Sequence, residues 1–191
     1  MNKKFEIIVC ASGGGGNFQK IIDKQNLIGY KIVKLICDKE CAAIKRAVDN
    51  NIEYVLIDKK KLKPTEFEKQ IKKELDINPD LIVLAGFMTI LSKDICCMFG
   101  NKIINTHPSL LPKYGGKGMY GVKVQESVMK NKEVYAGCST HFVTSEIDAG
   151  EIIFQEKIKI DYSLTPWELG GKIFDLEGDL LIKTIQNIMF K

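Results

Sequence analysis

The feature that most constrains the fold is a short apolar run that ends in glycines and leads into a helical pattern. Residues 5–11 are almost entirely apolar, as expected of a strand buried on both faces of a parallel sheet. Four consecutive glycines follow within residues 12–17, and residues 18–23 have helical spacing. This order of strand, glycine loop and helix predicts the beginning of a parallel α/β domain.

The rest of the chain continues the alternation of strands and helices. Apolar runs predict further strands at residues 31–37, 53–57, 81–85, 102–104, 136–143 and 152–155. Helical spacing predicts helices at residues 40–50, 65–75, 92–98, 122–130 and from Pro166 onward. The predicted fold class is α/β: a Rossmann-like, open, mostly parallel, twisted sheet with helices on both faces. A length of 191 residues with 45% hydrophobic content predicts a single domain over residues 1–191.

Charge and cysteine usage narrow the class of protein. The formal net charge is only +4 and the lysines are scattered, which argues against a dedicated nucleic-acid-binding protein. No run approaches the roughly 18 apolar residues of a membrane span. Residues 1–4 lead directly into the first strand, so we expect no secretory signal. The six cysteines lack the spacing of a zinc site, and we expect reduced thiols, no metal and a cytoplasmic location.

An amide and an imidazole stand where one apolar run ends. Asn105 and His107 follow residues 102–104, and Pro108 stiffens the backbone behind them. Side chains two positions apart in an extended segment point to the same face, so these two should project side by side. At the carboxyl end of a strand, such a pair is suited to polarising a carbonyl and moving a proton. The alternative is a hydrogen-bonded turn without a catalytic role.

The glycine loop at residues 12–17 is a candidate phosphate site. Glycines permit positive φ and expose backbone N–H groups, and a helix N-terminus adds partial positive charge. The spacing fits neither the dinucleotide fingerprint nor the nucleotide-triphosphate loop, so a phosphate monoester fits better. A flexible turn without a ligand is the alternative.

Other candidate positions have equally plain structural alternatives. The segment after Gly86 could line a pocket for a flat ligand, but composition favours Phe87 and Met88 as core residues. Asp148 is placed either to fix the tautomer and favour the charged form of a nearby imidazole or only to cap a turn. His141 is interpreted as a structural residue of its strand. The glycine-rich residues 113–121 predict a mobile loop over the site.

Four blocks of sequence together resemble the folate-dependent formyltransferases. They are residues 11–17, 84–92, 105–114 and 141–150, and the similarity spans nearly the whole chain. The resemblance implies the formyltransferase fold and transfer of the formyl group of 10-formyltetrahydrofolate to the primary amine of glycinamide ribonucleotide in purine synthesis. The expected partners are these two small molecules, with no nucleic acid and no membrane, and the expected state is a monomer or a homodimer.

The resemblance implies that Asn105, His107 and Asp148 form the catalytic trio. The amine would attack the formyl carbon directly. Asn105 and a protonated His107 would stabilise the negative charge that forms on the formyl oxygen. Asp148 would keep His107 charged and relay a proton through water to the departing folate nitrogen.

Binding roles follow from the resemblance in the same way. Gly15, Gly16 and Asn17 would hold the substrate phosphate, and Glu177 would contact the glycinamide or ribose part. Two loops and the catalytic amide would hold the folate, much of it through backbone groups. These residues are Met88, Thr89, Ile90, Leu91, Asn105, Thr144, Ser145, Glu146, Ile147 and Asp148.

Departures from the family pattern concern contacts outside the trio. Thr89 stands where the family often has an arginine, Phe174 replaces a commonly polar residue, and the loop at residues 115–120 differs in sequence. Family members that act on tRNA or hydrolyse the folate carry an additional domain, for which 191 residues are too few. A catalytically silent phosphate- or folate-binding module is the rival from another class.

Overall fold

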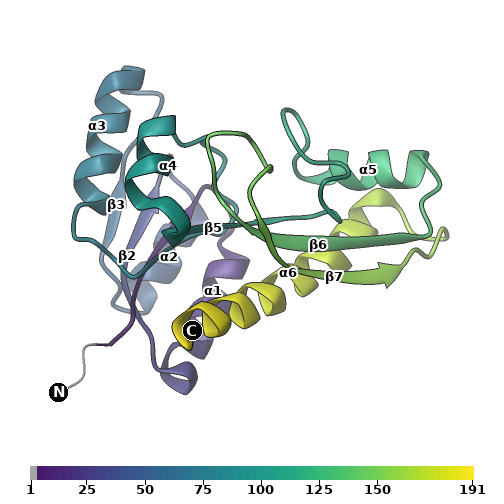
Figure 1. Ribbon diagram of the computed structural model, residues 1–191, viewed down its shortest axis with the longest axis horizontal. Helices are drawn as coiled ribbons and strands as arrows, with labels where there is room; N and C mark the ends of the chain where they lie inside the picture. The colour runs from purple at the N-terminus through teal and green to yellow at the C-terminus, as the bar shows by residue number, and fades with distance from the viewer. Residues whose placement is uncertain (1–3) are drawn as a thin grey trace. The chain divides into compact units, whose positions relative to one another are not determined.

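The computed structural model describes residues 4–191 and contains two compact units, Met1–Ile104 and Asn105–Lys191 (Figure 1). Within the described residues, seven strands and six α-helices alternate along the chain. Residues 1–3, on which the expectation about a secretory signal rests, lie outside the described residues. The expectation of one domain over residues 1–191 stays a prediction.

The first unit is built on parallel strands. The strand order is β3-β2-β1-β4, and each neighbouring pair is parallel. The strands are β1 (Glu6–Ala11), β2 (Lys31–Cys37), β3 (Tyr54–Leu56) and β4 (Leu81–Leu84). The helices are α1 (Gly16–Ile28), α2 (Ala42–Asp49), α3 (Pro64–Leu75) and α4 (Lys93–Phe99), followed by the 3-10 turn η1 (Gly100–Lys102).

Burial explains why these sequences form central strands. Ile7 and Ile8 are consecutive in β1 and both are fully buried, as are Ile82 and Val83 in β4. Because consecutive strand residues point to opposite faces, both faces of this sheet are covered. The apolar residues of α3 behave as predicted, since Phe67, Ile71 and Leu75 form its buried face.

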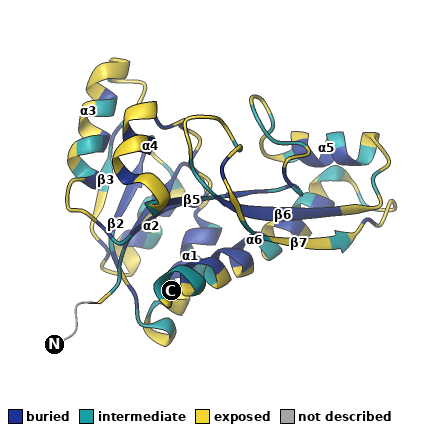
Figure 2. Ribbon diagram, in the orientation of Figure 1, coloured by how far each residue is buried: buried dark blue, intermediate teal, exposed yellow. Residues whose placement is uncertain are grey.

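The second unit contains the end of β5 (Ile103–His107), followed by α5 (Val122–Lys130), β6 (Tyr135–Phe142), β7 (Ile152–Lys159) and α6 (Pro166–Met189). Its strand order is β5-β6-β7, with β6 and β7 antiparallel. Figure 2 shows β6 buried along its length and β7 largely exposed. A capping box between Thr165 and Glu168, with Pro166 in the first turn, begins α6.

The predicted elements are confirmed, and with them the α/β class with a mostly parallel sheet. Most strand boundaries agree within one residue, but two strand ends differ by three or more residues. β5 continues through His107, and β7 continues to Lys159 instead of ending at residue 155. Charged residues end the apolar pattern at residue 156, but β7 is a half-exposed edge strand on which charges remain in water.

The structure also shows the state of the cysteines and the character of the helices. All six cysteines are free, and four of them are buried. Among residues 4–191 no helix has the length and apolar character needed to span a membrane. The same residues contain no cluster of three or more His, Cys, Asp or Glu side chains arranged to hold a metal ion.

Candidate active site

The end of β5 presents its side chains alternately to two faces. Asn105 is half-buried and His107 is 4% exposed. Thr106, between them, points the other way and donates its hydroxyl hydrogen to Glu177 Oε1 at 3.0 Å. Behind the strand, the N–H of Ser109 donates to the carbonyl of His107 at 2.9 Å, which forms a tight turn at Pro108. The backbone of this segment therefore fixes the direction of both candidate catalytic side chains.

Both ring nitrogens of His107 face oxygen acceptors. Nε2 lies 2.7 Å from the backbone carbonyl oxygen of Tyr114, and Nδ1 lies 3.4 Å from Oδ2 of Asp148. A carbonyl and a carboxylate can only accept hydrogen bonds, so each nitrogen is placed to donate. The two contacts fix the orientation of the imidazole ring.

Asp148 is the centre of the polar network. Besides His107, its Oδ2 accepts the N–H of Gly116 at 2.9 Å, and its Oδ1 lies 3.7 Å from Nε2 of His141. Asp148 adopts a left-handed backbone conformation with φ of 55°, which aspartate tolerates better than most residues. The residue therefore does more than cap a turn: it connects two histidines with the loop at residues 113–121.

His141 joins Asn105 to this network. Its Nδ1 donates to the carbonyl of Phe142 at 2.9 Å, which leaves Nε2 as the acceptor for the Asn105 amide nitrogen at 3.2 Å. Burial lowers the pKa of His141, and the hydrogen bond to Phe142 and the charge of Asp148 offset only part of that effect. The neutral ring thus fixes which end of the Asn105 amide is the donor. Sequence reasoning treated His141 as structural only; its position at the start of the fourth sequence block was the available signal.

Glu177 lies in α6 against the opposite face of β5. Its side chain is 8% exposed and accepts the hydroxyl hydrogen of Thr106. Burial raises the pKa of Glu177 to about 7, and the hydrogen bond from Thr106 opposes the shift. The carboxyl group therefore changes its charge near neutral pH.

The glycine loop has the geometry expected of an anion site. Gly15 adopts a left-handed conformation with φ of 70°, and its carbonyl accepts the N–H of Gln19 at 2.8 Å, so α1 begins at Gly16. The first turn of α1 contains no acidic side chain that would repel an anion. Asn17 is 5% exposed, and its Oδ1 is buried without a hydrogen-bond partner within the described structure. An amide oxygen only accepts hydrogen bonds, so its partner would have to be a donor and not a phosphate oxygen.

The loop after β4 divides its side chains between the interior and the surface. Met88 and Ile90 are 50% and 66% exposed, whereas Thr89 and Leu91 are buried. Thr89 donates to Oδ2 of Asp38 at 2.7 Å, so its side chain is directed inward. The core interpretation is confirmed for Phe87, which is 8% exposed, and is wrong for Met88. Exposed apolar side chains fit a flat ring system, while Thr89 and Leu91 can offer only backbone groups.

In the second unit, the other predicted folate loop lies at the surface. Thr144, Ser145, Glu146 and Ile147 are exposed. The Thr144 hydroxyl donates to the carbonyl of Glu146 and accepts its N–H, which fixes the turn before Asp148. This loop therefore presents Asp148 from a defined turn, with its other side chains accessible to a ligand.

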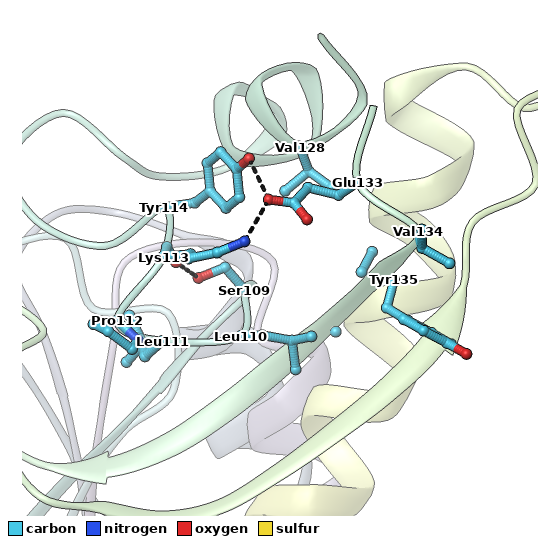
Figure 3. A pocket seen from close by; sticks show the side chains of 12 residues that line it. Ser109, Leu110, Leu111, Pro112, Lys113, Tyr114, Val128, Glu133, Val134 and Tyr135 are labelled. Carbon is cyan, nitrogen blue, oxygen red and sulfur yellow. Dashed lines mark hydrogen bonds and ion pairs between the residues drawn. The ribbon is translucent and has the colours of Figure 1, made fainter. Parts of the chain in front are cut away.

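A cavity of about 390 Å³ lies beside the loop that follows β5. Figure 3 shows Lys113 and Tyr114 converging on Glu133 at one side of it. Lys113 Nζ donates to Glu133 Oε1 at 2.9 Å, and the Tyr114 hydroxyl donates to the same oxygen at 3.0 Å. The cavity lining does not include Asn105, His107 or Asp148. Tyr114 is nevertheless held at both ends, since Glu133 binds its hydroxyl group and His107 its carbonyl.

Comparison with known proteins places this geometry in a family. The sequence pattern of the formyl transferase family matches residues 5–185. A phosphoribosylglycinamide formyltransferase of Bacillus subtilis is 33% identical over 98% of this chain and 95% of its own length. A chloroplastic enzyme of the same name from Arabidopsis thaliana is 31% identical over 96% of this chain.

The chain covers some relatives only in part, and it is also similar to a solved structure. The chain spans only 65% and 61% of the length of the Arabidopsis and Vigna unguiculata relatives. The crystal structure of phosphoribosylglycinamide formyltransferase from Brucella melitensis is similar with a TM-score of 0.89 and 28% identity, covering 98% of this chain and 96% of that one. With the family pattern matching nearly all of its residues, the chain belongs to the formyl transferase family.

Proposed function

We propose that this protein transfers the formyl group of 10-formyltetrahydrofolate to the primary amine of glycinamide ribonucleotide, a step of purine biosynthesis. The observation that carries the proposal is the network in which Asp148 lies within 3.4 Å of His107 and 3.7 Å of His141, while His141 contacts the Asn105 amide. It combines two hydrogen-bond donors with a carboxylate, as an acyl transfer to an amine requires.

In the proposed mechanism, Asn105 and His107 stabilise the carbonyl oxygen that becomes negative as the amine adds to the formyl carbon. Donors placed in this way contribute on the order of 3 kcal/mol each to the transition state. His141 keeps the Asn105 amide nitrogen in the donor position. His107 must first exchange its bond to the Tyr114 carbonyl for one to the ligand, so residues 113–121 shift when the site is loaded.

Asp148 carries out the second half of the proposed mechanism. The new carbon–nitrogen bond to the substrate amine forms, the bond to the folate nitrogen breaks, and one proton passes from the amine to that nitrogen. Asp148 holds His107 in its charged form and accepts and releases this proton through water. The bound folate supplies the formyl group at the oxidation level of the product, so the step needs no oxidant or reductant.

We further propose binding roles for the remaining residues. The N–H groups of Gly15, Gly16 and Asn17 bind the phosphate, and Glu177 interacts with the glycinamide or ribose part. The folate is held by the two loops, with side-chain contacts from exposed residues and backbone contacts alone from Thr89 and Leu91. The exposed residues of these loops are Met88, Ile90, Thr144, Ser145, Glu146 and Ile147.

The proposal also covers how the protein works as a whole. Residues 1–191 act as one formyltransferase domain, as a monomer or homodimer, in the cytoplasm. The substrates are two small molecules, and neither nucleic acid nor membrane takes part. The mild net charge of +4 supports this part of the proposal.

The test is product formation with a labelled donor. Purified protein is incubated with 10-[13C]formyltetrahydrofolate and glycinamide ribonucleotide, and the label is followed by NMR. Label in N-formylglycinamide ribonucleotide supports the proposal. Label appearing only as formate indicates hydrolysis, and binding of both ligands without any product identifies a silent binding module; either result overturns the proposal.

A further inference from the structure

The single arginine of the chain holds the glycine loop. Lysine and arginine together number 28, and Arg46 is the only arginine among them. It lies in α2, where its Nε donates to the carbonyl of Gly14 at 2.9 Å and its Nη1 donates to Oε1 of Gln19 at 3.1 Å. Gln19 in turn donates to Asp23 at 2.9 Å. One guanidinium group thus connects α2 with both the loop and the first turns of α1.

A second contact from α2 fixes the neighbouring peptide. The N–H of Ala43 donates to the carbonyl of Gly13 at 3.2 Å. In a planar trans peptide, the carbonyl of one residue and the N–H of the next point in opposite directions. Because the carbonyls of Gly13 and Gly14 are directed at α2, the N–H groups of Gly14 and Gly15 point away from it.

The start of α1 continues this orientation. The carbonyl of Gly15 accepts from Gln19, so the N–H of Gly16 also points outward from the helix. The N–H groups of Gly14, Gly15 and Gly16 therefore all point away from the groups that bind the preceding carbonyls. Successive N–H groups in such a turn form a concave anion-binding nest. Glycine at position 15 allows α2 to pack closely against the loop, because a Cβ there would lie 2.9 Å from Ala43 Cα and 3.1 Å from Arg46 Cδ.

We propose that Arg46 is the positioning residue for phosphate recognition: it binds the Gly14 carbonyl from behind the loop and so sets the direction of the Gly15 N–H, one of the groups proposed to bind the substrate phosphate. This inference rests on the proposed function for the identity of the phosphorylated substrate. Arg46 donates to the carbonyl side of the loop, so it acts on the phosphate through the backbone.

The chemistry of the guanidinium group explains why lysine does not replace it. Its donors lie in a rigid plane, so one group satisfies a backbone carbonyl and a side-chain amide at fixed angles. An ammonium group is a point donor on a flexible stem and does not fix two acceptors at once. The chain uses lysine at its other basic positions, such as the adjacent Lys45, which pairs with Asp49 at the surface of α2.

The test compares Arg46→Gln with Lys45→Gln, which removes an exposed charge from the same helix. Both variants are assayed with glycinamide ribonucleotide and with the corresponding nucleoside, which has no phosphate. For Arg46→Gln we expect KM for the ribonucleotide to rise about tenfold or more, equivalent to about 1.4 kcal/mol. We expect kcat to stay within about twofold and kcat/KM for the nucleoside to be unchanged. Arg46→Lys should recover only part of the affinity, and Lys45→Gln should match the wild type.

The outcomes separate positioning from a structural role. Equal losses for both substrates in Arg46→Gln, or a ribonucleotide KM equal to that of Lys45→Gln, would overturn the inference. If the wild type does not formylate the ribonucleotide, the proposed function fails. The role of Arg46 is then tested by calorimetry, which measures the binding of inorganic phosphate to the wild type and to each variant. Binding that is lost in Arg46→Gln but kept in Lys45→Gln supports the inference, and equal binding by wild type and Arg46→Gln, including none by either, contradicts it.

Discussion

Oδ2 of Asp148 lies 3.4 Å from Nδ1 of His107, and the same oxygen accepts the N–H of Gly116 at 2.9 Å. The other ring nitrogen of His107 contacts the carbonyl of Tyr114. The loop after β5 therefore binds both members of the pair, one through a carbonyl and the other through an N–H. Its position and the orientation of the imidazole ring are coupled, so a ligand that displaces the Tyr114 carbonyl from His107 also changes the surroundings of Asp148.

Asp148→Asn should slow turnover without altering the fold. Asparagine tolerates the left-handed backbone at this position, and its carbonyl oxygen still accepts the N–H of Gly116. In the proposed mechanism, the variant loses the carboxylate that pairs with His107 and relays the proton. We expect kcat to fall by roughly 10²- to 10⁴-fold with KM nearly unchanged.

The matched control is Glu151→Gln, which removes an exposed acid soon after Asp148 in the chain. Steady-state kinetics should show wild-type turnover for this control, and thermal unfolding should show equal stability for both variants. Near-normal kcat in Asp148→Asn would remove Asp148 from the mechanism.

His107 and Asp148 should behave as one unit. Because each acts through the other, the effect of His107→Ala and that of Asp148→Asn on kcat should be strongly non-additive. The double variant is expected to be about as slow as the slower single variant. If the loss of kcat in the double variant equals the product of the two single losses, the contact between His107 and Asp148 has no catalytic role.

Glu177→Gln should remove the pH dependence that the buried carboxyl imposes on stability. The pKa is about 7 in the folded protein and 4.5 in the reference state, so the folded protein holds this proton more tightly. The contribution to stability is complete below pH 4.5 and is lost as the pH rises through 7. Each pKa unit corresponds to about 1.4 kcal/mol, so the buried carboxylate costs on the order of 3 kcal/mol at pH 8.

Urea unfolding at pH 5 and pH 8 measures this difference. Glutamine keeps an acceptor for the Thr106 hydroxyl and carries no charge, so the variant should be more stable than the wild type at pH 8 and similar to it at pH 5. Glu126→Gln, at an exposed position of α5, serves as the control. A stability difference that is the same at both pH values would contradict the burial argument.

Gly15→Ala and Gly13→Ala should differ in stability although the two glycines share one loop. Alanine at position 15 must adopt φ of 70° and would place its Cβ 2.9 Å from Ala43 Cα, whereas a Cβ at Gly13 meets no atom within 4 Å. We expect a loss of roughly 1–3 kcal/mol for Gly15→Ala and roughly 0.5 kcal/mol or less for Gly13→Ala. Chemical unfolding measures both, and equal losses would show that the approach of α2 to Gly15 is not tight.

Much of the fold follows from local sequence patterns. Apolar runs gave the strands, and the alternation of side chains along β5 correctly separated Asn105 and His107 from Thr106. The end of β7 at Lys159 was missed, because an exposed edge strand accepts charges that end an apolar pattern. Local pattern is a good guide where burial alone decides the structure.

Residues whose roles depend on distant partners were harder to predict. His141 acquires its role from the Asn105 amide, and Arg46 from a carbonyl in the glycine loop. Thr89 was predicted to belong to a folate loop, but its hydroxyl group donates to Asp38, which follows β2, two strands away from β4 in the sheet. These pairings connect segments far apart in the chain, and one sequence contains no periodicity that reveals them.

The most direct test of the account is absorbance at the folate band with a 10-formyl folate and purified protein, recorded with and without glycinamide ribonucleotide. We predict release of free folate only when the ribonucleotide is present, and loss of that signal in His107→Ala. Release without the ribonucleotide, or no release in either case, would contradict direct transfer by the trio of Asn105, His107 and Asp148.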